Sequence, residues 1–516
     1  RDKEGTEIAK MLAGDEKKDD KKDEKKDSVK KVEKIKLDLE GREDRIFRLT
    51  RNSGRIGTHF LTEDGKKLLY IVRLESGYDL CSMDLEDKSV RVLKKGVYGF
   101  VPSPDGKNIY ISTGGGISKM SVNGGESKSI SYAGEYEYKP KAEREYIFDH
   151  MWKQVKEKFY DPDLHGVDWD YYRENYRKFL PYVNNDFDFA ELLSEILGEL
   201  NASHTGGRYR YSSGLSFGTL GVLYDSEYDG DGLKIKEVLP DGALSIADSE
   251  IKAGDIITSI EGKKIEAGKD WYQLLTGKAG KKIAITVKKG GKKETELFVT
   301  PGYSDNALLY RRWVKMREAK VKELSGGKIG YVHVQGMDSP SFREVYSKAL
   351  GKYRTADALI VDTRHNGGGW LHDDLVTFLG GKDYVNYQPR GRFIGKDPYS
   401  KWSKPSCVLV CEDNYSDACG FPYAYKALGI GKLIGAPVAG TMTAVWWEYQ
   451  INSSIVFGIP QVGSWCIDEG HYSENHQIEP DILVYNDPAS VLRGEDRQLE
   501  AAVREMLARS EEHTSE

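Results

Sequence analysis

Residues Val408 to Gly420 read VLVCEDNYSDACG, and they indicate the architecture of the C-terminal half of the chain. An apolar strand runs into polar residues, and we expect a helix to begin directly after Ser416. A serine placed there has an exposed hydroxyl beside the positive N–H groups of a helix end, which suits a nucleophile with anionic intermediates. The alternative is a helix-capping serine, which is the commoner reason for a serine at such a position.

A second informative stretch, ALIVDTRHNGGGW, occupies residues 358–370. Three glycines follow an apolar strand, and their backbone N–H groups can approach a substrate carbonyl closely, as an oxyanion hole requires. These glycines are Gly367, Gly368 and Gly369. A phosphate-binding loop is the competing interpretation, but the stretch lacks the Gly-Lys-Ser/Thr ending of such loops.

Strands and helices alternate from residue 304 to 510, around these two stretches, which predicts a layered α/β domain with a mainly parallel sheet. Residues 213–303 are rich in strand patterns, and residues 139–212 have helical periodicity. Residues 37–138 consist of short strands joined by Asp-Gly turns, and the turn glycines Gly65 and Gly106 are 41 residues apart. That period is typical of β-propeller blades, of which about two are present. Residues 1–36 are a charged, low-complexity segment, which we expect to be solvated.

Composition excludes several classes of function. Lys and Arg number 76 against 82 Asp and Glu, and this net charge of −6 argues against nucleic acid as a partner. No apolar run is long enough for a membrane helix. The five cysteines form no CxxC pair, so we predict neither disulfides nor a metal site, and no cofactor. Five of the histidines outside the Ser-His motif at residues 203–204 are interpreted as structural or surface residues: His150, His165, His333, His471 and His476.

Cysteine usage favours a reducing compartment, so we predict a cytoplasmic protein. The chain begins at Arg1, which leaves a periplasmic or secreted location as the alternative.

Together, the glycine triplet and the strand–serine–helix element resemble the tricorn-type and tail-specific serine peptidases of peptidase family S41. The string GDIITSIEG at residues 254–262, with GTLG at 218–221, resembles PDZ domains, which bind peptides by strand addition. A generic β-sandwich is the alternative. The order of segments resembles the later part of tricorn-type enzymes, which implies a partial β-propeller, a helical domain, a PDZ-like domain and a ClpP/crotonase-like α/β domain. It also implies peptide substrates and a homo-oligomer, by analogy a hexamer.

The resemblance implies a set of catalytic residues. Ser416 would be the nucleophile and His204 the base, with Ser203 and Glu474 orienting the imidazole. The N–H of Asp417 and one of the glycine triplet would hold the oxyanion. Glu474 begins the string ENHQIEPD, in which Gln477 stands where glycine is usual, and this departure concerns the local turn. With an ordinary histidine as base, we expect the rate to rise through a pKa near ~6.5.

Other members of the family use a lysine base about 25 residues after the serine. The corresponding stretch here, GTMTAVWW at residues 440–447, contains no lysine, and Lys426 and Lys432 flank it at other spacings. The sequence therefore predicts a serine peptidase that cleaves unfolded peptides. A Ser-Lys dyad enzyme and a non-catalytic PDZ/propeller scaffold are the alternatives.

Overall fold

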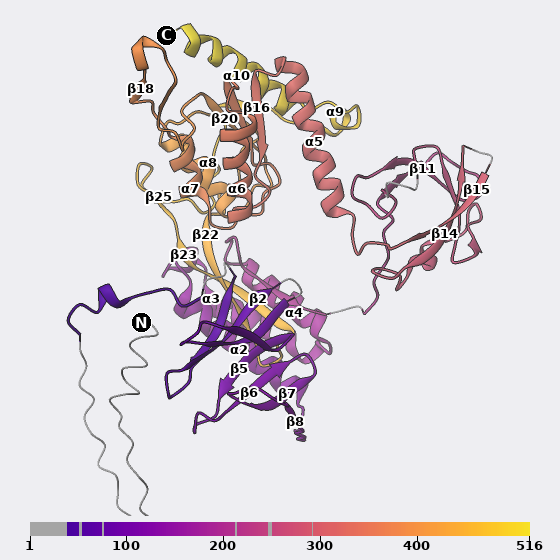
Figure 1. Cartoon of the computed structure of the whole chain (residues 1–516), viewed down its shortest axis with the longest axis vertical. Coiled ribbons are helices and arrows are strands. Elements are labelled where there is room, and N and C mark those ends of the chain that lie inside the picture. Colours follow the sequence, from indigo (N-terminus) through magenta and orange to yellow (C-terminus); the bar gives the residue numbers. More distant parts are fainter. Residues whose placement is uncertain are drawn as a thin grey trace, which may run out of the picture. The chain divides into compact units, whose positions relative to one another are not determined.

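The computed structural model describes residues 39–50, 54–74, 77–211, 214–245, 250–290 and 293–515. The charged segment predicted at residues 1–36 lies outside these ranges. The chain divides into two compact units, with the boundary between Glu137 and Tyr138, and each unit is described by itself (Figure 1). Within the described ranges, no helix combines the length and the apolar character needed to cross a bilayer.

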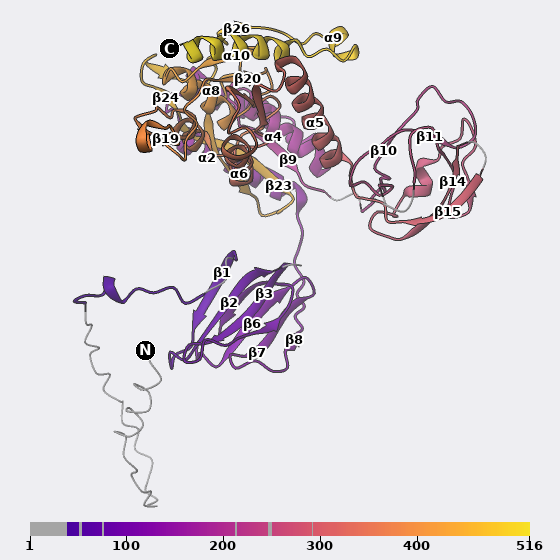
Figure 2. The ribbon, with the colours of Figure 1, turned by 45° about the horizontal axis from the view of Figure 1, so that its top comes forward.

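The N-terminal unit consists of two antiparallel sheets of four strands each (Figure 2). The sheets share one core, to which the first contributes Leu69 and Leu80 and the second Phe100 and Ile109. The strands of the first sheet are β1 (Ile56–Leu61), β2 (Lys67–Leu74), β3 (Gly77–Asp84) and β4 (Val90–Lys94). Those of the second are β5 (Val97–Pro102), β6 (Asn108–Thr113), β7 (Gly116–Ser121) and β8 (Lys128–Ile130).

The two copies of the sequence repeat in this unit form turns with the same hydrogen bonds. Thr62 Oγ1 donates to Asp64 at 2.6 Å, and Ser103 Oγ donates in the same way to Asp105 at 2.5 Å. The following glycines, Gly65 and Gly106, both have a positive φ, at 66° and 64°. A four-stranded sheet per repeat agrees with the blade pattern, whereas a propeller remains a prediction.

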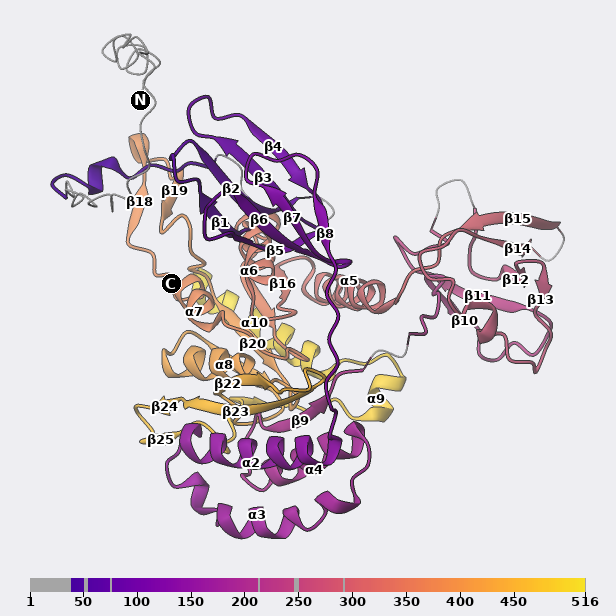
Figure 3. The same cartoon turned by 90° about the horizontal axis from the view of Figure 1, so that it is seen from below.

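The second unit begins with helices α2 (Pro140–Lys158), α3 (Trp169–Arg177) and α4 (Asp186–Gly198). Helices α2 and α4 pack on one face of a three-stranded antiparallel sheet, and α3 packs against these two helices (Figure 3). The strand order is β22-β23-β9, with bounds Thr443–Tyr449, Ile455–Gly463 and Gly206–Tyr209. Ile455, Phe457 and Ile459 of β23 lie in the same core as the helices. The helical segment and the predicted α/β segment are therefore joined by a shared sheet, which the sequence does not indicate.

Residues 222–299 form a six-stranded sheet with the order β10-β11-β12-β14-β15, in which β13 pairs with β12. The backbone of the GTLG stretch packs tightly here: a Cβ on Gly221, whose φ is 68°, would lie 2.5 Å from the Cα of Gly242. The strands are β10 (Val222–Tyr224), β11 (Leu233–Val238), β12 (Ile256–Ile260), β13 (Lys263–Lys264), β14 (Ile283–Lys289) and β15 (Lys293–Val299).

A parallel five-stranded sheet forms the C-terminal part, in the order β16-β17-β20-β21-β26. Its strands span Ile329–His333, Ala358–Asp362, Ser406–Val410, Lys432–Gly435 and Ile482–Leu483. Helices α6 (Ser339–Ser347), α7 (His372–Leu379) and α8 (Asp417–Ala427) cover one face, and α5 (Asn306–Ser325) and α10 (Arg497–Ser515) cover the other. Buried strands with helices on both sides agree with the predicted layered α/β domain, whereas the ClpP/crotonase-like label stays a prediction.

Short elements complete this part of the chain. They are the hairpins β18 (Val385–Tyr387) with β19 (Gly395–Asp397) and β24 (Trp465–Cys466) with β25 (His471–Tyr472), and the helix α9 (Pro488–Leu492).

Candidate active site

Ser416 lies in the loop between β20 and α8 and immediately precedes the helix, as expected from the sequence, but its side chain does not cap the helix. Its backbone has φ 57° and ψ −126°, a conformation that is rare for residues other than glycine. Its N–H donates to Thr441 Oγ1 at 3.1 Å. This strained turn leaves the hydroxyl free of the capping role that would otherwise explain a serine at a helix end.

The glycine triplet packs directly against Ser416. A Cβ on Gly368 would lie 2.5 Å from the Cβ of Ser416 and 3.1 Å from the backbone nitrogen of Asp417. The N–H of Gly368 is already used, because it donates to Asn366 Oδ1 at 2.8 Å. Gly367 and Gly369 are therefore the members of the triplet whose N–H groups are candidates for an oxyanion hole with Asp417.

A chain of hydrogen bonds connects His204, Ser203 and Glu474, although Glu474 is 271 residues from Ser203. The Ser203 hydroxyl donates to Glu474 Oε2 at 3.0 Å and lies 2.9 Å from His204 Nδ1. Thr443 Oγ1 lies 3.0 Å from the same nitrogen. Because the serine hydrogen points to the carboxylate, His204 Nδ1 must be the donor to Ser203, which leaves Nε2 with a lone pair.

Tyr415, which precedes Ser416 in the sequence, contacts this histidine. The N–H of His204 donates to the Tyr415 hydroxyl at 2.7 Å, and the two rings lie 4.7 Å apart between centroids. Tyr415 immediately precedes Ser416, so His204 contacts the residue next to the serine from a segment more than 200 residues away in the sequence.

Burial governs the charge state of the site. Desolvation lowers the pKa of His204 to about 4, so the imidazole is neutral at pH 7 and able to accept a proton. Burial also raises the pKa of the Glu474 carboxyl, against the two hydrogen bonds that it accepts from Ser203. The expectation of an ordinary histidine pKa near ~6.5 is therefore wrong for this half-buried ring.

The turn that contains Glu474 is fixed by its neighbour. Asn475 Nδ2 donates to the carbonyl of Asn201 at 2.7 Å, and the N–H of Asn475 donates to Gly440 at 2.9 Å. Asn475 has a positive φ of 62°, whereas Gln477 does not. A glycine is consequently not required at position 477, and the departure from the family string has no backbone cost.

The carboxylate of Asp417, in addition to its backbone N–H, has a structural role at this site. Its buried carboxylate accepts from the backbone N–H of Leu371 at 2.5 Å and of His372 at 3.1 Å, and from His372 Nδ1 at 2.5 Å. The hydrogen bond to Asp417 raises the pKa of His372. The first turn of α8 is thus fastened to the N-terminus of α7, which follows the glycine triplet.

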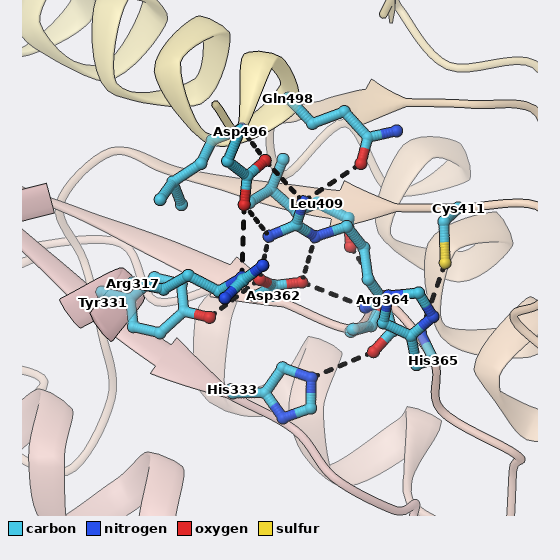
Figure 4. A network of polar contacts seen from close by, with 12 residues as sticks. Arg317, Tyr331, His333, Asp362, Arg364, His365, Leu409, Cys411, Asp496 and Gln498 are labelled. Carbon is cyan, nitrogen blue, oxygen red and sulfur yellow. Dashed lines mark hydrogen bonds and ion pairs between the residues drawn. The ribbon is translucent and has the colours of Figure 1, made fainter. Parts of the chain in front are cut away.

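A buried ionic cluster supports the strand that precedes the glycines (Figure 4). Arg364 bonds Asp362 at 2.7 Å and Asp496 at 2.8 Å, and its side chain is only 2% exposed. Burial opposes the charge of Asp362, but Arg364 outweighs it and holds the pKa of that carboxyl at about 2. The Asp-x-Arg pair of the glycine motif therefore anchors the loop to the start of α10.

The two flanking lysines have partners outside this site. Lys426 Nζ donates to the carbonyl of Glu479 at 2.8 Å, and Lys432 pairs with Glu505 at 2.7 Å. Thr441 lies 25 residues after the serine, which is the spacing at which other members of the family have a lysine base.

The fold also assembles two groups of possible metal ligands that sequence spacing did not indicate. They are His365 with Cys411 and Asp413, and Cys466 with Glu469 and His471; within each group the ligand atoms lie within 4.8 Å of one another.

Three residues that contact the predicted site residues were not predicted from the sequence: Tyr415, Thr443 and Asn475. Tyr415 and Asn475 each adjoin a predicted site residue, and that adjacency was the available signal.

Comparisons with known proteins identify related chains and a solved structure with a similar fold. Three protein-family descriptions match the chain: the Tricorn protease C1 domain over residues 140–198, the Tricorn protease PDZ domain over 218–302 and Peptidase family S41 over 328–484. Tricorn protease homolog 1 of Streptomyces coelicolor is 28% identical over 512 residues, covering 92% of this chain and 48% of its own length.

Tricorn protease of Thermoplasma volcanium is 27% identical over 451 residues, covering 85% of this chain and 44% of its own. The chain thus spans about half the length of the curated relatives it matches. The crystal structure of the tricorn protease superimposes with a TM-score of 0.75 at 22% identity, over 86% of this chain and 46% of that one. This superposition shows a shared fold.

Proposed function

The chain is a tricorn-like member of peptidase family S41, and on that premise we propose that it cleaves unfolded peptides with Ser416 as the nucleophile. The observation that supports this most strongly is the hydrogen-bonded chain from Glu474 through Ser203 to His204 Nδ1. It leaves His204 Nε2 unprotonated beside the segment that contains Ser416, where a general base is needed.

In the proposed reaction, Ser416 Oγ attacks the scissile carbonyl while His204 Nε2 accepts the hydroxyl proton. The N–H of Asp417 and one of Gly367 or Gly369 would stabilise the oxyanion. The imidazolium then protonates the leaving amine, and water hydrolyses the acyl-enzyme by the same base. Glu474 acts through Ser203, which orients the ring and stabilises its charged form.

Cleavage of a fluorescence-quenched unfolded polypeptide tests this proposal. Ser416→Ala and His204→Ala should each lose activity by ~10⁴-fold or more, as for other catalytic triads. Lys426→Ala, the matched test of the lysine alternative, should cleave at the wild-type rate. Turnover that survives His204→Ala and disappears in Lys426→Ala would reject the histidine base in favour of a Ser-Lys dyad.

The scaffold alternative is less well supported, because binding alone gives no reason for a strained serine packed on glycines and a polarised histidine. Peptide access through the PDZ-like sheet, and assembly into an oligomer such as a hexamer, belong to the proposal by analogy. A cytoplasmic location stays a prediction from the sequence.

A further inference from the structure

The sheet β22-β23-β9 has two faces with different surroundings. Side chains alternate between faces along a strand, and residues opposite one another share a face. One face, with Ile455 and Phe457, packs on the helices α2 and α4. The register places Tyr449 opposite Val456 and Val456 opposite Arg208, so this row of side chains lies on the other face.

This second face begins at the candidate catalytic histidine. Thr443, on the same side of β22 as Trp447 and Tyr449, lies 3.0 Å from His204 Nδ1. A Cβ on Gly458 would lie 2.6 Å from the carbonyl oxygen of His204 and 2.9 Å from the Trp447 ring. The absence of a side chain at Gly458 therefore lets the Trp447 ring lie across the sheet, next to the backbone of His204.

A cavity of about 640 Å³ lies on this sheet, and its lining includes Arg208, Arg210, Trp447 and Tyr449. The guanidinium of Arg208 lies 3.8 Å from the centroid of the Trp447 ring. Arg210 lies 5.5 Å from the Tyr449 ring and donates from Nη1 to the Tyr449 hydroxyl at 2.7 Å. We call these four residues the arginine–aromatic face.

The two arginines of this face outnumber the carboxylates that line the cavity. Among the described residues, no ion pair is found for Arg208 or Arg210, and both side chains are exposed. Glu191 of α4 is the acidic residue that lines the cavity, which leaves the lining with an excess of one positive charge. An arginine stacked on an aromatic ring keeps its N–H edge available and correctly oriented for a carboxylate.

We propose that the arginine–aromatic face binds carboxylates of the peptide substrate and so selects acidic peptides for cleavage. This inference rests on the proposed function, because the selected peptide is the one whose scissile bond reaches His204. Acidic side chains and the C-terminal carboxylate offer the same chemistry, and the experiment distinguishes them.

The test measures binding separately from cleavage. Fluorescent peptides of one length, with Asp/Glu or with the isosteric Asn/Gln, are titrated against full-length Ser416→Ala by fluorescence anisotropy, each with a free or an amidated C-terminus. We expect the acidic peptides to bind about tenfold more tightly than their amide isosteres, the order expected of two exposed ion pairs. If only amidation weakens binding, the face recognises the chain terminus; if only the Asn/Gln exchange does, it recognises side chains.

Charge reversal provides the matched control. Adding Arg208→Glu to Ser416→Ala should abolish the preference for acidic peptides, and in the wild-type background it should raise KM for them while kcat is kept. Arg354, exposed and stacked 5.2 Å from Tyr399, undergoes the same charge change elsewhere, and Arg354→Glu should keep the preference.

Equal affinities of all four peptides, acidic or Asn/Gln and free or amidated, or equal effects of the two reversals, would overturn the inference. Either result would leave the proposed peptidase function standing. That function would be contradicted if the wild type cleaved no peptide.

Discussion

At the scale of single residues, the proposed role of His204 as the general base predicts an acid limit of activity. Only the neutral imidazole can accept the serine proton, so kcat/KM should rise with pH as His204 loses its proton. Desolvation lowers the pKa of His204 to about 4, which places this rise near pH 4 and predicts a plateau through neutrality. A pH–rate profile on a neutral peptide measures it. A midpoint at the ordinary histidine value of ~6.5 would mean that the ring is more hydrated than its burial indicates.

Gly368 is the second residue with a specific expectation. An added methyl group would lie 2.5 Å from the Cβ of Ser416, at a φ of 95° that disfavours any side chain. Gly368→Ala should therefore displace the serine and abolish turnover.

Gly351→Ala is the matched control, since a Cβ there meets nothing within 4 Å at an ordinary φ, and it should leave turnover unchanged. Comparable kinetic constants for the two variants would show that the contact between Gly368 and the serine is unimportant.

At the scale of elements, the ionic cluster of Arg364, Asp362 and Asp496 stabilises the junction of β17, the glycine loop and α10. Arg364→Met would leave the buried Asp362 without its cation and Asp496 with Arg317 as its remaining cation, which should cost ~3–5 kcal/mol in the free energy of unfolding. Arg493→Met removes a surface arginine paired with Glu495 and should be close to neutral. Urea unfolding of both variants measures the difference.

The same cluster gives the wild type a pH dependence with a definite sign. Asp362 titrates at about 2 in the folded chain and near ~3.9 when unfolded, so its contribution is fully present above pH 4. It should be lost progressively as the pH falls towards 2. An Arg364→Met variant that unfolds at the wild-type urea concentration would contradict this role.

Local patterns explain which elements the sequence could predict. The helix after Ser416 and the buried strands on either side of it follow from short-range apolar periodicity, and the turns at Gly65 and Gly106 from repeated Asp-Gly signals. The pairing of β9 with β23 could not be predicted, because residues 206–209 and 455–458 are distant in the sequence and no local pattern specifies their register. The lowered pKa of His204 was missed for the same reason, since it depends on burial by segments far along the chain.

At the scale of the whole molecule, all the candidate catalytic residues belong to the unit that begins at Tyr138. A chain of residues 138–516 should therefore fold and cleave short peptides with a kcat/KM comparable to that of the full chain. Circular dichroism checks folding, and the ratio of kcat/KM values checks activity. A folded but inactive truncated chain would place an essential part of the site in the N-terminal unit.

Labelling of the full chain with a fluorophosphonate, followed by mass-spectrometric identification of the modified peptide, tests most directly whether Ser416 is a nucleophile activated by His204. Such a probe reacts with a serine that a general base has activated. We expect modification of Ser416 in the wild type and in Lys426→Ala, and its loss in His204→Ala. Absence of label on Ser416 in the wild type, or undiminished labelling in His204→Ala, would contradict this expectation.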